Sequence, residues 1–230
     1  MDYMLRPEDT VGVTFWLISV AMVASTAFFF LESNSVAKHW QTSVRVAGLI
    51  TLIAAVHYYY MRNVWVGSGE NPNVYRYIDW LLTVPLQMIE FYLILAAVGA
   101  ATSGMFWRLL VGTLVMLVAG FLGESGAINS TVGFIVGMAG WIYILYEVFA
   151  GEAARASASS NSEAQKTAFS AMKWIVSIGW SIYPIGYFLG YLAGGRDEAT
   201  LNLVYNLADI INKIAFGLVI WTAAKSESKA

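Results

Sequence analysis

The sequence contains no cysteine, which excludes disulfide bonds and thiolate chemistry, and it has few charged residues. Asp, Glu, Lys and Arg make up 12% of the 230 residues, against about 25% in a typical soluble domain. No basic run suggests a nucleic-acid partner, and the two histidines, His39 and His57, form no metal-ligand cluster. We therefore expect no metal site and no nucleic-acid binding.

The sequence does contain long apolar runs, and 58% of its residues are hydrophobic. A bilayer core needs about 20 mainly apolar residues per helix, and seven such stretches are present. They lie near residues 11–31, 43–64, 73–100, 104–123, 129–150, 168–193 and 200–224. The pattern predicts an all-α membrane protein, a seven-transmembrane-helix bundle in one domain over residues 1–230. The Ala- and Ser-rich connection 151–167 predicts a flexible surface loop.

Basic residues predict the orientation of the bundle. Arg76 and Lys213 lie within spans, and only Arg6, Arg62 and Arg196 fall on the side that carries the N-terminus. The other side carries Lys38, Arg45, Arg108, Arg155, Lys166, Lys173, Lys225 and Lys229. Because basic residues concentrate on the cytoplasmic side of membrane proteins, we expect the N-terminus outside and the C-terminus in the cytoplasm. The location is then a cell membrane, which in a bacterial host is the inner membrane, with the lipid bilayer as a partner.

Two charged residues in the seventh span need an explanation, because a charge at mid-bilayer costs about 2.5–3.5 kcal/mol on insertion scales. Asp209 and Lys213 are four residues apart and share a helix face. One interpretation is a structural ion pair that fixes helix packing. The other is a desolvated lysine available for Schiff-base formation, with Asp209 as its counterion.

Two acids in the third span favour the second interpretation. Asp79 and Glu90 are eleven residues apart, which puts them on one helix face and about 16 Å apart along its axis. In the predicted orientation, Arg76 and Asp79 lie toward the outside and Glu90 lies toward the cytoplasm. One acid on each side of Lys213 is the arrangement that a directional proton relay needs.

Three segments together resemble the microbial rhodopsins. Residues 76–85 (RYIDWLLTVP) resemble the family's third helix, residues 180–187 (WSIYPIGY) its sixth, and residues 209–213 (DIINK) its lysine-bearing seventh. Residues 57–62 (HYYYMR) and 202–209 (NLVYNLAD) are similar to proteorhodopsins in particular. The likeness covers essentially the whole chain. It implies a light-driven outward proton pump that binds retinal and is not an enzyme.

The resemblance assigns roles along the proton path. It implies all-trans retinal on Lys213 as a protonated Schiff base, with Asp79 as counterion and acceptor and Glu90 as cytoplasmic donor. Burial disfavours a charged carboxyl, so Glu90 would hold its proton until it is needed. Acids at both positions, with Thr83 between them, fit a proton pump. A chloride pump would lack the first acid, and a sodium pump would show Asn, Asp and Gln.

Other residues are expected around the charged site. Arg76 and Asp209 complete it, and Thr83 can hydrogen-bond near it. His57 resembles the family's second-helix histidine, whose hydrogen bond to Asp79 would influence when that acid titrates. The release route beyond Asp79 stays open. Glu124 and Glu147 lie near span ends and are most simply interfacial, with a place on the outward path as the alternative for Glu124.

A retinal pocket follows from the same resemblance. Trp80 and Trp180 are expected to sandwich the polyene, and Tyr183 and Tyr58 to contact the Asp209 carboxylate. The remaining expected contacts are Met116, Gly120, Gly137, Trp141, Pro184 and Tyr187. Without the matched motifs, aromatic residues in a helical bundle are most simply core. Pro85 and Pro184 would kink their helices.

Gln87 has two interpretations. By itself, a glutamine in a span is more often a hydrogen-bonder between helices, but the resemblance makes Gln87 a predictor of the colour. In proteorhodopsins this is the main spectral tuning position, where leucine accompanies green absorption and glutamine blue absorption. Light moves positive charge away from the Schiff base, so a polar group that favours the ground state widens the energy gap. The resemblance therefore implies a blue-absorbing form.

Partners and alternatives complete the expectations. Trp16 and His57 resemble positions that meet across a protomer boundary, which implies a homo-oligomer, pentamer or hexamer. The alternative for these two residues is a lipid-facing tryptophan and an intramolecular histidine.

One alternative function is a sensory or regulatory rhodopsin with the same chromophore and a slow photocycle. Another is a seven-helix receptor or transporter that binds no retinal.

Overall fold

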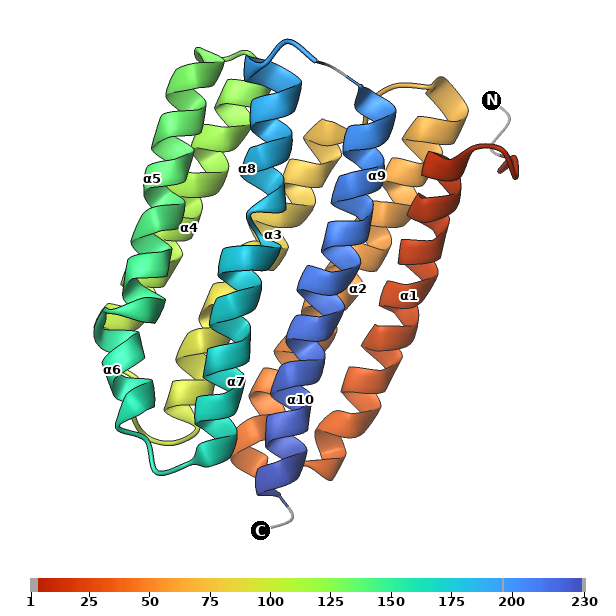
Figure 1. The fold of residues 1–230 in the computed structure, drawn as a ribbon. Coiled ribbons are helices and arrows are strands. Elements are labelled where there is room, and N and C mark those ends of the chain that lie inside the picture. Colours follow the sequence, from red (N-terminus) through yellow and green to blue (C-terminus); the bar gives the residue numbers. More distant parts are fainter. Residues whose placement is uncertain (1–3, 196, 229–230) are drawn as a thin grey trace.

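The computed structural model describes residues 4–195 and 197–228, which form helices and their connections. Seven of these helical segments are long and apolar enough to cross a membrane. They stand side by side, with the N-terminal and C-terminal ends at opposite ends of the bundle (Figure 1). The predicted seven-helix bundle is confirmed. Arg196 and Lys229, which entered the charge comparison, lie outside the described residues.

The seven segments are built from fourteen helical elements. The first four are α1 (Thr10–Glu32) with the short 3-10 turn η1 (Ser33–Ser35), α2 (Lys38–Ser68), α3 (Asn73–Ala96) and α4 (Ser103–Glu124). The fifth is α5 (Ser130–Phe149) followed by α6 (Glu152–Ala158). The sixth is α7 (Glu163–Trp174), η2 (Ile175–Gly179), α8 (Ile182–Tyr187) and η3 (Phe188–Leu192). The seventh is α9 (Glu198–Asp209), η4 (Ile210–Ala215) and α10 (Phe216–Glu227).

Side-chain caps fix where five of the helices begin. Asp9, Thr102, Asn129, Ser162 and Asp197 each accept a hydrogen bond from a main-chain amide of the following first turn. Such caps satisfy donors that a helix leaves unpaired at its N-terminus. At Asp197, hydrogen bonds from the hydroxyl and amide of Thr200 hold the pKa of the carboxyl below its usual range.

The bundle has apolar outer faces and a polar centre. Large apolar side chains such as Leu17, Val56 and Ile135 are exposed on the outside, where lipid would cover them. The charged side chains of Asp79 and Lys213 are buried in the interior. This distribution is the reverse of that in a soluble protein and is typical of a membrane bundle with a functional interior.

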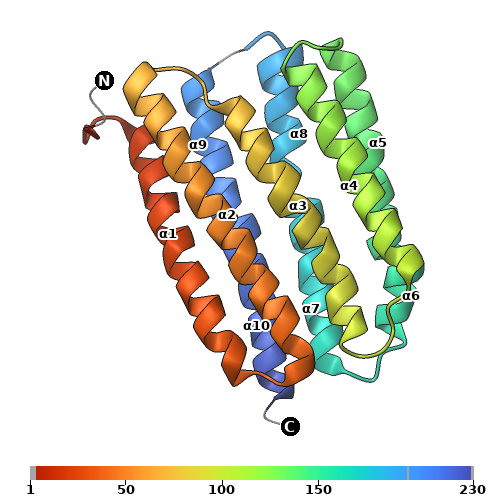
Figure 2. The ribbon, with the colours of Figure 1, turned by 180° about the vertical axis from the view of Figure 1, so that it is seen from behind.

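The arrangement of the helices puts α3 opposite the sixth and seventh segments. In Figure 1, α7–α8 and α9–α10 lie in front of α3, and the reverse view in Figure 2 shows α2, α3 and α4 in front. α3 packs against both α2 and α4. The polar residues of α3 therefore meet those of the seventh segment inside the bundle.

The expected flexible loop at residues 151–167 is wrong, because most of this segment is helical. α6 occupies residues 152–158, and α7 begins at Glu163, five residues before the predicted span. Arg108 on α4 binds Glu147 (Nε to Oε2 3.0 Å) and also Glu152. The Ala153 amide donates to Glu147 Oε1 at 3.1 Å. Alanine favours helix, and these contacts anchor the segment. Glu147, near the end of α5, is thus buried and paired.

The third helix ends earlier than its apolar run suggested. The expected span reached residue 100, but α3 ends at Ala96 and a turn follows. Gly99 in that turn has a φ of 72°, a left-handed conformation that favours glycine. The apolar pattern continues past the helix end because these residues still pack against the bundle.

Candidate functional site

Lys213 lies between two carboxylates in the interior. Its Nζ is 2.6 Å from Oδ2 of Asp79 on α3 and 2.6 Å from Oδ2 of Asp209 on the seventh segment. All three side chains are almost fully buried. A buried cation is tolerated when opposite charges accompany it. The structure therefore brings Lys213 together with Asp79 and with its expected counterion Asp209.

The two carboxylates have different surroundings. Asp209 accepts hydrogen bonds from Tyr58 Oη at 2.7 Å, Tyr183 Oη at 2.5 Å and Trp80 Nε1 at 3.4 Å. Oδ1 of Asp79, by contrast, is buried and has no hydrogen-bond partner in the described ranges. Donors around a carboxylate favour its ionised form. Asp209 is thus saturated with donors, and Asp79 keeps an oxygen free for a proton.

Arg76 is held by neutral groups one turn of α3 before Asp79. Its Nη1 donates to Tyr58 Oη at 2.9 Å, and its Nη2 donates to Asn202 Oδ1 at 2.8 Å and Asn206 Oδ1 at 2.9 Å. No ion pair joins it to a carboxylate within residues 4–195 and 197–228. The positive charge of Arg76 therefore remains available to act on the carboxylates beside Lys213.

Glu90 lies on α3, eleven residues beyond Asp79, in an apolar environment. It is fully buried, and neither carboxyl oxygen has a hydrogen-bond partner in the described part of the chain. The hydroxyl of Ser43 on α2 lies close to it. An unpaired carboxylate in such a place would cost several kcal/mol. The geometry therefore suits a carboxyl that carries a proton.

The structure places His57 and Thr83 beside Asp79, but neither donates a hydrogen bond to its carboxylate. His57 Nδ1 is 3.9 Å from Asp79 Oδ1, too far for a hydrogen bond, and it lies 2.9 Å from the main-chain oxygen of Ile53. The ring nitrogen that lies nearest to Asp79 is thus within hydrogen-bond distance of the preceding turn of α2, and the expected hydrogen bond from His57 to Asp79 is wrong for this nitrogen. Thr83 donates to the main-chain oxygen of Asp79 at 3.0 Å, so its hydroxyl turns toward its own helix.

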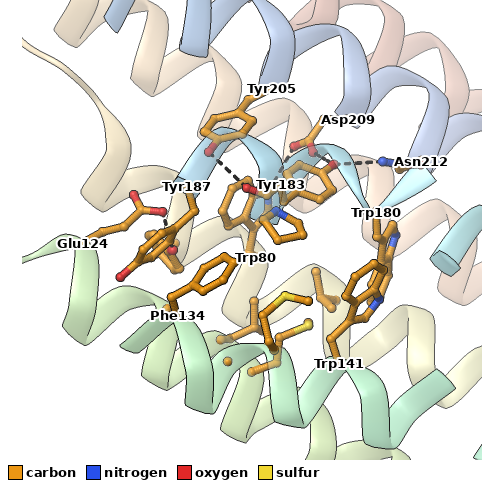
Figure 3. A pocket seen from close by; sticks show the side chains of 18 of the residues that line it. Trp80, Glu124, Phe134, Trp141, Trp180, Tyr183, Tyr187, Tyr205, Asp209 and Asn212 are labelled. Atoms are coloured by element: carbon orange, nitrogen blue, oxygen red, sulfur yellow. Dashed lines mark hydrogen bonds between the residues drawn. The ribbon is translucent and has the colours of Figure 1, made fainter. Parts of the chain in front are cut away.

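A cavity extends from Lys213 between α3, α4, α5 and the sixth segment. It holds about 800 Å³ of empty space, including its open part. The predicted pocket residues that line it are Lys213, Trp80, Gln87, Met116, Gly120, Gly137, Trp141, Trp180, Tyr183, Pro184, Tyr187 and Asp209. In Figure 3, Trp80, Trp141, Trp180 and Tyr187 surround this space, with Asp209 at its edge.

Two predicted pocket residues, Tyr58 and Thr83, do not line the cavity. Tyr58 reaches the site from α2 and ends on Asp209, while Thr83 is bonded to the backbone of its own helix. Both are fully buried beside the charged groups. Their contribution is to the surroundings of the carboxylates rather than to the wall of the pocket.

The site thus consists of a buried lysine between two acids, at the end of an aromatic cavity within seven membrane helices. The comparison with protein families agrees with this arrangement. The family model for bacteriorhodopsin-like proteins covers residues 9–227. The chain belongs to the bacteriorhodopsin-like family. It is therefore a multi-pass protein of the cell membrane.

Relatives within this family include proteorhodopsins. The chain is 54% identical to the blue-light absorbing proteorhodopsin of Gamma-proteobacterium Hot 75m4, over 96% of this chain and 88% of that one. It is 51% identical to the green-light absorbing proteorhodopsin of Gamma-proteobacterium EBAC31A08, over 97% and 90%.

Solved structures of rhodopsins show the same fold. The crystal structure of blue light-absorbing proteorhodopsin from Med12 is 53% identical, with a TM-score of 0.84, and covers 95% of this chain and 100% of that one. Exiguobacterium sibiricum rhodopsin is 34% identical, with a TM-score of 0.85, over 95% and 97%.

Several residues of the site were missing from the sequence-based prediction. Asn202 and Asn206 lie seven and three residues before Asp209, and Asn212 directly precedes Lys213. The first two share a helix face with Asp209 and Lys213, so a polar stripe in an apolar span was a usable signal.

Aromatic and acidic residues of the cavity wall were also missed. Phe134, Tyr77 and Tyr205 line the cavity without a motif that distinguishes them from core. Glu124, the last residue of α4, lines it too and accepts a hydrogen bond from Tyr77 Oη at 2.7 Å. These contacts depend on packing between distant helices, which the sequence pattern alone does not specify.

Proposed function

We propose that the protein is a light-driven outward proton pump, with retinal bound to Lys213 as a protonated Schiff base. The unequal surroundings of the two carboxylates beside Lys213 carry this proposal. Asp209 is occupied by three donors besides Lys213, whereas Asp79 has one buried oxygen without a partner in the described residues. Asp79 is therefore the group with room for a transferred proton.

The cavity fits an elongated apolar aldehyde such as retinal. Its wall is mainly aromatic and aliphatic, with Trp80 and Trp180 among the lining residues and the amine of Lys213 at the charged end. Gly120 and Gly137 also line it. An apolar pocket with a few convergent polar groups is typical of ligand sites.

Bound retinal would supply a light-driven change of shape that alters the proton affinity of the nitrogen on Lys213. Asp79, 2.6 Å away, receives the proton on the side of Arg76. Asp209 stays ionised because Tyr58 and Tyr183 donate to it. The order of these events depends on differences in proton affinity between neighbouring groups.

Glu90 then returns a proton to Lys213 from the opposite side. Because it is buried and has no hydrogen-bond partner in the ranges described, it keeps its proton in the resting protein. Arg76, held by Asn202 and Asn206, places a fixed positive charge on the other side of Asp79. We propose that this side faces outward, on the basis of the distribution of basic residues.

The colour and assembly belong to the same proposal. Gln87 lines the cavity, which supports a polar influence on the absorption maximum and a blue-absorbing form.

Trp16 is exposed and stacks with Arg62, whose Cζ is 5.6 Å from the ring centroid. This outer face of α1 and α2 is where Trp16 and His57 would meet a second protomer of a pentamer or hexamer.

Illumination of unbuffered cells that express the protein with added retinal tests the function. The external medium should become more acidic in light, and a protonophore should abolish the change. A visible absorption band without a pH change would instead favour a sensory or regulatory rhodopsin. Absence of a visible band would contradict both functions, and light-driven alkalinisation would contradict the proposed direction.

A further inference from the structure

Gln87 is bonded to the main chain next to Lys213. Its Nε2 donates to the main-chain oxygen of Asn212 at 2.7 Å. Both side chains are buried, and Gln87 is 1% exposed. The carbonyl that it binds belongs to the peptide bond between Asn212 and Lys213. The carboxamide of α3 thus reaches across the bundle to the residue that carries the reactive amine.

The segment around this carbonyl is not an ordinary α-helix. Residues Ile210–Ala215 form the π-helical element η4 within the seventh segment. A π-helical turn replaces the usual i to i−4 pairing with i to i−5 pairing, and such turns occur often at functional sites. A side-chain donor from another helix is therefore well placed to fix the position of a carbonyl here.

The side chain of Asn212 is held from the sixth segment. Its Nδ2 donates to the main-chain oxygen of Gly179 at 3.1 Å and to Tyr183 Oη at 3.1 Å. Tyr183 in turn donates to Asp209. In Figure 3, dashed lines link Asn212 to Tyr183 and Tyr183 to Asp209. The residue before Lys213 is therefore bonded to α3 through its backbone and to the sixth segment through its side chain.

We infer that Gln87 is a positioning residue for Lys213. Its bond to the Asn212 carbonyl sets the direction of the Lys213 side chain, and hence how closely Nζ approaches Asp79 and Asp209. This inference rests on the proposed function, because it assigns the colour effect of Gln87 to the geometry of the lysine–carboxylate site. A closer approach to negative charge stabilises the ground state and moves absorption toward blue.

A direct effect of polarity makes a different prediction. If the carboxamide dipole acts on the polyene through space, any polar side chain at this position should preserve most of the blue absorption. If the tether matters, a polar side chain too short to reach the Asn212 carbonyl should lose it. Gln87→Asn removes one methylene group and retains the amide. Gln87→Met removes the donor and nearly preserves the length.

Solid-state NMR can observe the relevant peptide bond by itself. Asn is followed by Lys only once in the sequence, at Asn212–Lys213. Protein labelled with ¹³C at the asparagine carbonyl and ¹⁵N at lysine therefore gives a single correlated signal. Because this signal does not need retinal, it can be recorded both before and after retinal is added.

The expected result is an upfield shift of the Asn212 carbonyl signal in Gln87→Met and Gln87→Asn, with and without retinal. Gln165→Met is the matched control, because Gln165 is also buried but its Nε2 donates to Ser157 Oγ at 3.2 Å, near the ends of α6 and α7. This control should leave the signal unchanged. Both Gln87 variants should also move the visible maximum of the retinal-bound protein to longer wavelength.

Two results would overturn the inference. One is an Asn212 carbonyl signal that is the same in wild type and in both Gln87 variants. The other is a shifted carbonyl signal in Gln87→Asn together with an unchanged visible maximum, which would separate the tether from the colour. Failure of pumping in cells would not move the retinal-free carbonyl signal, so the two proposals fail independently.

Discussion

Nζ of Lys213 lies 2.6 Å from Oδ2 of Asp79, and this contact joins α3 to the seventh segment inside the bundle. The second oxygen of Asp79 has no hydrogen-bond partner among the residues that the structure describes. Asp209, at the same distance from Nζ, is already surrounded by donors. The lysine is thus placed between two carboxylates with unequal hydrogen bonding, which is the basis for the proposed proton transfer to Asp79.

If Asp79 is the proton acceptor, as we propose, its replacement should stop outward pumping. Asp79→Asn keeps the size of the side chain but cannot take the proton, and we expect the initial rate of light-driven acidification to fall by about 100-fold or more, the usual contribution of a positioned acid or base. The control is Glu163→Gln, which alters an exposed ion pair with Lys166 and should pump normally. Undiminished acidification by Asp79→Asn would contradict the role of Asp79.

Acid should switch pumping off and change the colour together. Below the pH at which Asp79 takes up a proton in the dark, the acceptor is full and pumping stops. The loss of its negative charge beside Lys213 also destabilises the ground state, so the visible maximum should move to longer wavelength as the pH falls. A pH titration of absorbance and of pumping should give matching midpoints.

The titration has an internal control. Asp79→Asn lacks the titrating carboxyl, so its visible maximum should stay constant over the same pH range. A transition of unchanged size and midpoint in Asp79→Asn would assign the colour change to another group.

Replacement of Glu90, the proposed donor, should slow the second half of the cycle alone. In Glu90→Gln we expect proton transfer to Asp79 to keep its rate, while the return of a proton to Lys213 slows by about 100-fold. Because that proton must then come from solution, its rate should fall about tenfold for each unit rise in pH. Flash photolysis measures both phases, and a pH-independent return at the wild-type rate would exclude Glu90 as donor.

The colour should respond to Gln87. We expect Gln87→Leu to move the visible maximum to longer wavelength, because leucine cannot bond to the Asn212 carbonyl and lacks a polar group at the cavity wall. The absorption spectrum of the purified protein checks this. An unchanged maximum would show that residue 87 does not tune this protein.

The ion pair between α4 and α5 should stabilise the fold without affecting the proton path. Glu147 is buried, but the Arg108 side chain is 33% exposed, so Glu147→Gln should cost about 1–3 kcal/mol, less than a fully buried pair. Thermal loss of the visible band measures this as a lower midpoint temperature. Lys166→Ala, which removes an exposed pair with Glu163, should leave the midpoint unchanged.

The sequence predicts the large features of this molecule because they follow from one-dimensional patterns. Seven apolar runs give seven helices, and the cost of a charge inside a bilayer singles out Asp79, Glu90, Asp209 and Lys213. The matching of three helices to a family then supplies the aromatic pocket.

The features that the sequence could not supply arise from contacts between segments. The π-helical element η4 and the bond from Gln87 to the Asn212 carbonyl depend on how two helices pack. The helical α6 depends on Arg108, which lies more than forty residues earlier in the chain. His57 has the residue type expected of a partner for Asp79, yet its ring nitrogen lies 2.9 Å from the Ile53 carbonyl of its own helix.

Time-resolved infrared difference spectroscopy tests the central claim most directly, because a carboxyl that gains a proton acquires a C=O stretching band. After a light flash, such a band should rise as Lys213 loses its proton. It should be absent from Asp79→Asn and shift in frequency when aspartate is labelled with ¹³C at the side-chain carboxyl. A band that persists unchanged in Asp79→Asn would contradict the assignment of Asp79 as the proton acceptor of Lys213.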